Sequence, residues 1–144
     1  MNYLLDTNVI SEFARPKPDE HVVRWLESLD EDVLFLSVIT LAELRRGVAL
    51  LPHSRRRIAL EFWLQNDLTA RFEGRLLNIT PHIAHIWGEM MAQAKLNGFA
   101  LHAMDALIGA TARSHDMVLV TRNTKDFIHL SIDLKNPWLA QESF

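Results

Sequence analysis

Short, mostly apolar runs alternate along the chain with longer stretches in which apolar residues recur every three or four positions. The apolar runs lie at residues 3–5, 33–36, 75–79, 117–120 and 132–134. Consecutive apolar positions of this length are typical of parallel strands that are buried on both faces. The pattern therefore predicts a sheet of short, buried strands separated by helices.

The stretches between these runs carry signals for the start and the end of helices. Helices are expected at about residues 7–14, 19–29, 40–51, 54–69, 81–96 and 104–115. Asp6 and Asp19 stand where an N-terminal cap is favoured, and Thr40 is expected to open the third helix. Asn97 and Gly98 follow the last apolar position of the fifth helix and are expected to end it.

The alternation of strands and helices indicates the fold class. Parallel strands joined by helices form right-handed crossovers, which place helices on both faces of the sheet. The chain has 144 residues, the size of one domain, and shows neither an internal repeat nor a linker. We therefore predict a single three-layer α/β domain over residues 1–144, with a central parallel sheet and a core between about residues 2 and 138.

The composition excludes several classes of protein. Hydrophobic residues make up 49% of the chain and charged residues 23%, which excludes a disordered chain. Cysteine is absent, which excludes disulfides, thiolate nucleophiles and cysteine-ligated zinc. The N-terminus does not resemble a signal peptide, and no apolar run is long enough to span a bilayer. We therefore expect a soluble, cytoplasmic protein without a membrane partner.

Charge is distributed unevenly, although the formal net charge is only −3. Residues 1–43 carry a balance of −6, whereas residues 44–75 carry seven arginines and a balance of +4. Five of these arginines are candidates for contact with nucleic acid or a protein partner: Arg45, Arg46, Arg55, Arg56 and Arg57. The ordinary alternative for them is a solvated helix face.

Acidic and amide side chains fall where the predicted strands end. Asp6 follows the first strand, Glu43 lies in the helix after the second, and Asp105 begins the helix before the fourth. Asn123 follows the fourth strand, and Asp126 comes one helical turn later. Because ligands bind outside the carboxyl ends of parallel strands, we expect these side chains to share one rim of the sheet.

Each of these side chains also has an ordinary structural interpretation. Asp6 is a good cap for the first helix, and Thr40 with Glu43 matches the spacing of a capping box. The helix dipole favours Asp105 near a helix start, and Asn123 is common in turns. These interpretations do not predict that all of the polar residues meet at one end of the sheet.

Clustered carboxylates raise one another's pKa unless a cation neutralises them. With oxygen ligands and no cysteine, the expected ion is hard, which favours Mg²⁺ with Mn²⁺ as a substitute. Mg²⁺ is typically held by one or two carboxylates together with waters and phosphate oxygens, and it activates water for phosphodiester hydrolysis. The residues therefore predict a divalent-metal site for phosphodiester chemistry.

Four segments, in this order, resemble the PIN-domain ribonucleases, specifically the VapC-type toxins of bacterial type II toxin–antitoxin pairs and their FitB-like branch. The segments are YLLDTNVISE at residues 3–12, LSVITLAEL at 36–44, MDALIGATA at 104–112 and LVTRNTKDF at 119–127. The ending Asn136-Pro137-Trp138 also resembles the FitB-like branch. The resemblance covers essentially the whole chain.

The resemblance implies a metal-dependent endoribonuclease toxin that cleaves RNA, is silenced by a small, DNA-binding cognate antitoxin and forms a homodimer. In the family pattern Asp6 and Asp105 are metal ligands, and Glu43 is a third, supporting acidic residue. Thr7 orients the first aspartate or a water on the metal. Position 123 departs from the pattern, because many relatives have an acidic residue where this chain has Asn123. The sequence leaves open whether Asn123 or Asp126 fills the fourth site position, and whether one or two ions bind.

A binding module is the competing hypothesis: a PIN-like domain that docks RNA or a protein partner with weak or no nuclease activity. Asn123 favours this hypothesis, whereas the intact Asp6, Glu43 and Asp105 oppose it. Cleavage of DNA rather than RNA is a third option that the motifs do not exclude. The sequence names neither the RNA target nor the antitoxin class.

Overall fold

Five parallel strands form a central sheet in the computed structural model, which describes residues 1–140. The strands are β1 (Tyr3–Leu5), β2 (Leu34–Ser37), β3 (Leu76–Leu77), β4 (Val118–Val120) and β5 (Leu134–Lys135). Their spatial order is β3-β2-β1-β4-β5, so the chain builds from β1 to one edge and then returns to build the other. The strand order therefore reverses between β1 and β4, the place where ligands bind in such sheets.

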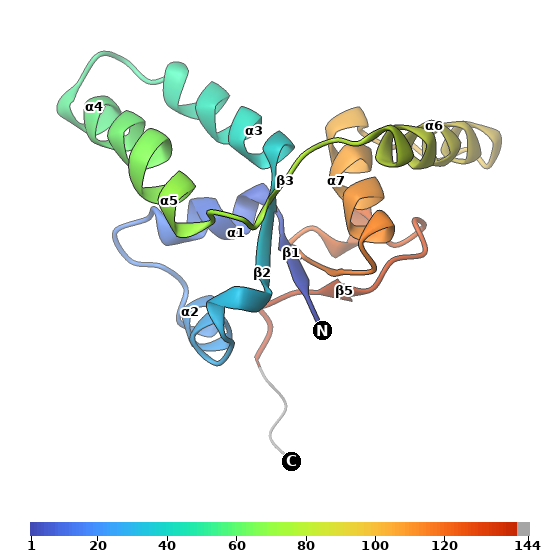
Figure 1. Ribbon diagram of the computed structural model, residues 1–144, viewed down its shortest axis with the longest axis horizontal. Helices are drawn as coiled ribbons and strands as arrows, with labels where there is room; N and C mark the ends of the chain where they lie inside the picture. Colours follow the sequence, from blue (N-terminus) through green and yellow to red (C-terminus); the bar gives the residue numbers. More distant parts are fainter. Residues whose placement is uncertain (141–144) are drawn as a thin grey trace.

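Helices lie on both sides of the sheet (Figure 1). On one side are α1 (Thr7–Phe13), α2 (Glu20–Glu27), α3 (Val38–Ala49), and a long helical stretch made of α4 (Arg55–Phe62), the π-helical segment η2 (Trp63–Leu68) and α5 (Thr69–Arg71). On the other are α6 (Pro81–Leu96) and α7 (Ala103–Ser114). Two 3₁₀ turns complete the described chain, η1 (Glu31–Val33) and η3 (Thr124–Asp126). The predicted three-layer α/β domain is thus confirmed.

The core consists of two apolar clusters, one on each face of the sheet. Leu4 and Leu119 belong to the cluster under α6 and α7, whereas their neighbours Leu5 and Val120 belong to the cluster under α1, α2 and α3. Successive strand residues point to opposite faces, so a strand buried on both sides must be apolar at every position. This is the physical reason why continuous apolar runs predicted the strands.

The start of α3 differs from the prediction. The helix begins at Val38, and the Ser37 hydroxyl caps it by accepting a hydrogen bond from the Ile39 N–H at 3.0 Å. Thr40, expected to open this helix, is fully buried inside its first turn. Val38 and Ile39 are β-branched and extend the apolar run of β2, so the capping serine rather than their strand preference decides where the helix begins.

Most other predicted boundaries agree with the structure to within one to three residues. Asp19 caps α2 by accepting hydrogen bonds from two backbone N–H groups, as predicted. The helical stretch predicted at 54–69 runs from Arg55 to Arg71. Asn97 and Gly98 end α6, and Gly98 adopts a φ of +76°, which favours glycine. Within residues 1–140, no helix combines the length and apolar character needed to cross a bilayer.

Candidate active site

Asp6 is both the cap of α1 and a buried carboxylate at the carboxyl end of β1. Its side chain is only 5% exposed. Oδ1 accepts a hydrogen bond from the Thr7 N–H at 2.8 Å, and Oδ2 accepts one from the Thr121 hydroxyl at 2.7 Å. The Asn8 side-chain amide donates to Oδ2 at 3.4 Å. The two interpretations of Asp6 are therefore compatible, because the hydrogen bond that caps the helix also fixes the carboxylate.

The environment of Asp6 disfavours its negative charge. Burial raises the pKa of Asp6 from 3.8 to about 6, against the opposing hydrogen bonds from Thr121 and Thr7. The negative charges of Asp105 and Glu43 raise the Asp6 pKa further. A buried carboxylate that is repelled by two others gains most from a bound cation.

Glu43 joins this group through a hydrogen bond to Thr7, not through a capping box. The Thr7 hydroxyl donates to Glu43 Oε1 at 2.7 Å and lies 3.3 Å from the Thr40 hydroxyl oxygen. The capping-box interpretation is wrong because Ser37, and not Thr40, is the cap residue. Thr7 connects the first turn of α1 to α3 and holds Glu43 beside the end of β1.

We expect Glu43→Gln to impair metal-dependent activity while leaving stability nearly unchanged. The glutamine amide oxygen still accepts the Thr7 hydroxyl hydrogen bond, so the free energy of unfolding should change by less than about 0.5 kcal/mol. The negative charge is lost, and binding of Mn²⁺ should weaken about tenfold or more. Calorimetric Mn²⁺ titration and thermal melting measure the two effects. Unchanged Mn²⁺ affinity would mean that Glu43 has only a structural role.

Asp105 supplies the third carboxylate from the first turn of α7. It is half-buried, and burial raises its pKa; the nearby charge of His102 lowers it, whereas the negative charges of Glu43 and Asp126 raise it. Asp105 therefore interacts electrostatically with both Asp6 and Glu43, although α7 lies on the opposite side of the sheet from α1 and α3.

The three carboxylates line one cleft of about 480 Å³ beside the point where the strand order reverses. The residues that line it are Asp6, Thr7, Asn8, Ser11, Glu12, Arg15, Glu43, Asp105, Arg122, Asn123 and Trp138. Of the predicted site residues, Asp6, Thr7, Glu43, Asp105 and Asn123 are thus brought together. Asp126 is exposed at the end of η3 and lines an adjoining pocket with Asp105 and His102. Asn123 and Asp126 therefore flank Asp105 in two neighbouring pockets rather than one.

Several residues that line this cleft or support it from behind were not singled out from the sequence. Thr121 is fully buried, and its hydroxyl contacts Asp6 while accepting hydrogen bonds from the Asn123 N–H at 3.1 Å and the Asn8 amide at 3.3 Å. A polar residue directly after an apolar strand was the available signal. Arg122 and Trp138, also unpredicted, line the cleft together.

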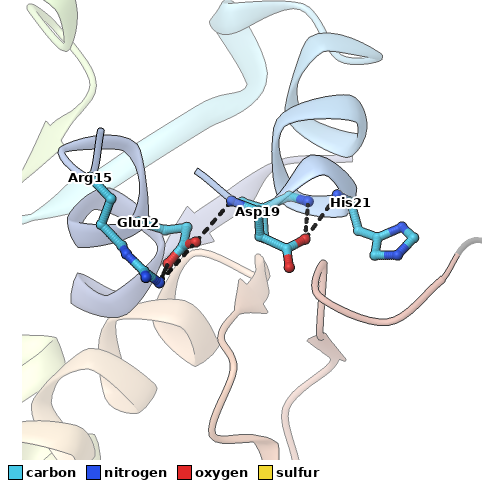
Figure 2. A network of polar contacts seen from close by, with 5 residues as sticks. Glu12, Arg15, Asp19 and His21 are labelled. Atoms are coloured by element: carbon cyan, nitrogen blue, oxygen red, sulfur yellow. Dashed lines mark hydrogen bonds and ion pairs between the residues drawn. The ribbon is translucent and has the colours of Figure 1, made fainter. Parts of the chain in front are cut away.

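Glu12 and Arg15 also line the cleft. Figure 2 shows the polar contacts that they form with each other and with Asp19. The Glu12 carboxylate is buried and accepts a hydrogen bond from the Asp19 N–H at 2.9 Å. Arg15 Nη1 lies 3.2 Å from Glu12 Oε2, so the two charges form an ion pair. The Glu12 carboxylate therefore connects α1 to the start of α2 through Asp19 and pairs with the charge of Arg15.

The five arginines of the basic stretch lie on helices outside this cleft. Arg45 and Arg46 are exposed on α3, and Arg55 and Arg56 are exposed on α4. Arg57 is partly buried, pairs with Glu61 at 2.8 Å and donates to the Leu51 carbonyl. None of the five is among the residues that line the acidic cleft, so any role in binding RNA or a partner requires a surface beyond it.

The donors of the cleft fit a hard divalent cation. Asp6, Glu43 and Asp105 contribute carboxylates to the lining of the cleft, and neither histidine nor cysteine lines it. Within residues 1–140, no group of three or more His, Cys, Asp or Glu side chains is placed to hold a metal ion, so the three carboxylates do not form a complete ligand shell by themselves. Mg²⁺ does not require such a shell, because waters and substrate oxygens complete its coordination.

Comparisons of sequence indicate one family. The PIN domain matches residues 3–132. Toxin FitB of Neisseria gonorrhoeae is 42% identical over 135 residues, which cover 94% of this chain and 97% of FitB. VapC ribonuclease Y4jK of Sinorhizobium fredii is 37% identical over 135 residues, which cover 94% of this chain and 96% of that protein.

Solved structures agree with the sequence comparison. A chain in the structure of FitAB bound to the IR36 DNA fragment superposes with a TM-score of 0.91 and 39% identity, over 99% of both chains. A chain in the crystal structure of FitAcB from Neisseria gonorrhoeae gives a TM-score of 0.89 and 42% identity, over 94% of this chain and 98% of that one. The chain therefore belongs to the PIN-domain family, in the branch that includes the toxin FitB and the VapC ribonucleases.

Proposed function

We propose that this protein is the toxin of a type II toxin–antitoxin pair and an Mg²⁺-dependent endoribonuclease, for which Mn²⁺ substitutes. The observation that carries the proposal is the convergence of Asp6, Glu43 and Asp105, from three elements, on one cleft at the reversal of strand order. Two of these carboxylates have raised pKa values, which is expected where a cation normally balances them.

The names of relatives support RNA as the substrate rather than DNA. Ribonuclease VapC2 of Haemophilus influenzae is 30% identical over 88% of this chain, and the tRNA(fMet)-specific endonuclease VapC of Shigella flexneri is 26% identical over a similar share. Both names denote cleavage of RNA, the second name denotes an endonuclease, and the more similar Y4jK is also called a ribonuclease.

In the proposed reaction the protein supplies positioned negative charge. When bound, Mg²⁺ neutralises the phosphate and activates water for attack on phosphorus. Asp6 and Asp105 would hold the ion, and Glu43 would support them. The hydrogen bonds from Thr7 and Thr121 keep Asp6 and Glu43 oriented, so little reorganisation is needed on binding. Asn123 lies at the same cleft and offers a neutral oxygen to the ion or its waters.

We propose a small DNA-binding antitoxin as the partner that silences the cleft. Several structural neighbours are toxin–antitoxin complexes, and those of FitAB and of VapBC2 from Rickettsia felis contain DNA. We further propose that the toxin is a homodimer and acts in the cytoplasm, where its RNA substrate and its antitoxin are found.

The proposed activity predicts cleavage of RNA that depends on a divalent cation. Purified protein should cut a synthetic RNA internally with Mg²⁺ or Mn²⁺, and EDTA should stop the reaction. A DNA of the same sequence should remain intact. RNA binding without cleavage, under every metal condition, would favour the alternative of a binding module, for which the replacement of a fourth acid by Asn123 is the supporting observation.

A further inference from the structure

We propose that Arg122, held against Trp138 at the rim of the acidic cleft, binds a backbone phosphate of the RNA next to the bond that is cleaved. This inference rests on the proposed function and adds a substrate contact to it. Arg122 and Trp138 line the same cleft as Asp6, Glu43 and Asp105.

The backbone of Arg122 is tied to the site. The preceding residue, Thr121, donates a hydrogen bond to Asp6, and the Arg122 N–H donates to Asn8 Oδ1 at 3.3 Å. On its other side, the Arg122 carbonyl accepts a hydrogen bond from the Asn136 side-chain amide at 3.4 Å. Arg122 therefore has a fixed position relative to the carboxylate of Asp6.

Trp138 holds the guanidinium group and leaves its donors available. The guanidinium carbon of Arg122 lies 5.4 Å from the centre of the Trp138 ring. The indole is partly buried against the core. The backbone N–H of Trp138 donates to Asn136 Oδ1 at 3.0 Å, which fixes the chain at this point. A cation–π contact uses the face of a guanidinium, whereas its N–H groups lie in the plane and can bind two phosphate oxygens.

In the part of the chain that the structure describes, no carboxylate pairs with Arg122. Within residues 1–140, ion pairs engage Arg15, Arg57 and Arg71, and Arg122 is in none of them. Arg15 lines the same cleft, but Glu12 neutralises it (Figure 2). Arg122 is thus the cation at this cleft that remains available for an anion.

A phosphate is the ligand that this arrangement favours. An RNA chain that enters the cleft brings successive phosphates towards three carboxylates, and cations must offset the repulsion. The divalent ion would neutralise the charge of the phosphate that reacts. A neighbouring phosphate needs a separate cation at the rim. The guanidinium group of Arg122, which lies against Trp138, is such a cation, and it does not occupy the position between the carboxylates where the metal ion would bind.

RNA affinity and its salt dependence test this contact. The probe is a short, labelled single-stranded RNA, and all variants carry Asp105→Asn so that the RNA stays intact. Arg122→Gln should weaken binding about tenfold at low salt, because a hydrogen-bonded charge contact is lost. It should also make the slope of log affinity against log salt shallower by about 0.7, as expected for one phosphate contact.

Matched variants separate the phosphate contact from loss of folding or of general charge. Arg122→Lys should keep the salt slope and recover only part of the affinity, because it retains the charge but not the planar fork. Trp138→Leu should weaken binding less than Arg122→Gln, with the slope retained. Arg24→Gln removes an exposed arginine on α2, away from the cleft, and should change neither quantity. Melting temperatures exclude unfolded variants.

Each outcome decides the inference. Unchanged RNA affinity and slope in Arg122→Gln would overturn it, and a simultaneous loss of antitoxin binding would assign Arg122 to the protein partner instead. If the parent protein cleaves RNA but Arg122→Gln binds RNA with unchanged affinity, the inference about Arg122 is wrong and the proposed function stands. A parent protein that neither binds nor cleaves RNA defeats the proposed function as well.

Discussion

Asp105→Asn is expected to abolish Mg²⁺-dependent RNA cleavage, and Asp6→Asn should do the same. Asparagine keeps the size of each side chain but removes the negative charge that holds the ion. Mutation of a residue that only orients a metal ligand lowers metal affinity or activity about 10–100-fold. Loss of a ligand itself should therefore lower the cleavage rate by at least about a hundredfold. The initial rate of cleavage of a synthetic RNA measures the effect, and relief of growth arrest on expression without the antitoxin reports it in cells.

Asp133→Asn is the matched control for this pair. Asp133 is exposed and does not line the acidic cleft, so the same chemical change should leave cleavage unaltered. Parallel purification of all three variants guards against a contaminating ribonuclease, which would cleave in every preparation. Full activity in verified Asp105→Asn would refute the assignment of the active site.

Asp6→Asn is also expected to stabilise the protein when metal is absent. The pKa of Asp6 is about 6 in the folded protein and 3.8 ordinarily, so the folded state holds this proton more tightly than the unfolded chain. Below about pH 3 the group is protonated in both states and costs nothing. As the pH rises through 6 the folded protein must ionise it, which lowers the free energy of unfolding by about 3 kcal/mol at neutral pH.

Asparagine avoids this cost. With its amide oxygen in the place of Oδ1 it can still accept the Thr7 N–H, but its amide nitrogen then takes the place of Oδ2, where the Thr121 hydroxyl and the Asn8 amide lose their acceptor. Two lost hydrogen bonds cost about 2 kcal/mol, so we expect a net gain of about 1 kcal/mol at pH 7. In EDTA, Asp6→Asn should be less stable than the parent at about pH 3 and more stable above about pH 6.5. Chemical denaturation across this range measures it, and comparison with the parent removes the contribution of all other titrating groups.

Added metal should reverse the order of stability. Saturating Mn²⁺ at about a hundred times its dissociation constant stabilises a binding protein by about 2.7 kcal/mol, and the parent should gain this while Asp6→Asn should not. If Asp6→Asn melts at the parent's temperature in EDTA and responds equally to Mn²⁺, Asp6 is a helix cap and not a metal ligand.

The fold was largely predictable because its determinants are local. Strands buried on both faces require continuous apolar runs, so residues 3–5 and 117–120 identified β1 and β4 closely. Caps such as Asp19, which act over two or three residues, were predictable for the same reason. The start of α3 was not, because Ser37 and Thr40 are both good caps and the sequence alone does not say which hydroxyl is free to act.

The acidic rim was predictable from topology together with the family resemblance. Every parallel strand ends at the same edge of the sheet, so Asp6, Glu43, Asp105 and Asn123 were expected to gather there, and they line one cleft. Asp126 was placed in the same group, but the η3 turn carries it into the adjoining pocket. A short 3₁₀ turn changes direction within three residues, and the apolar pattern holds no information about that direction.

Only the tertiary structure decided how these side chains are connected. The hydroxyls of Thr7 and Thr121 contact carboxylates 36 and 115 residues away in sequence, and Arg122 meets Trp138 beside them. By itself, the sequence determined which residue types stand at the strand ends, since burial and periodicity act on neighbours along the chain. Which hydroxyl contacts which carboxylate, and which of the two arginines at the cleft forms an ion pair within residues 1–140, depends on distances between separate elements. Packing of the two helical layers against the sheet sets those distances.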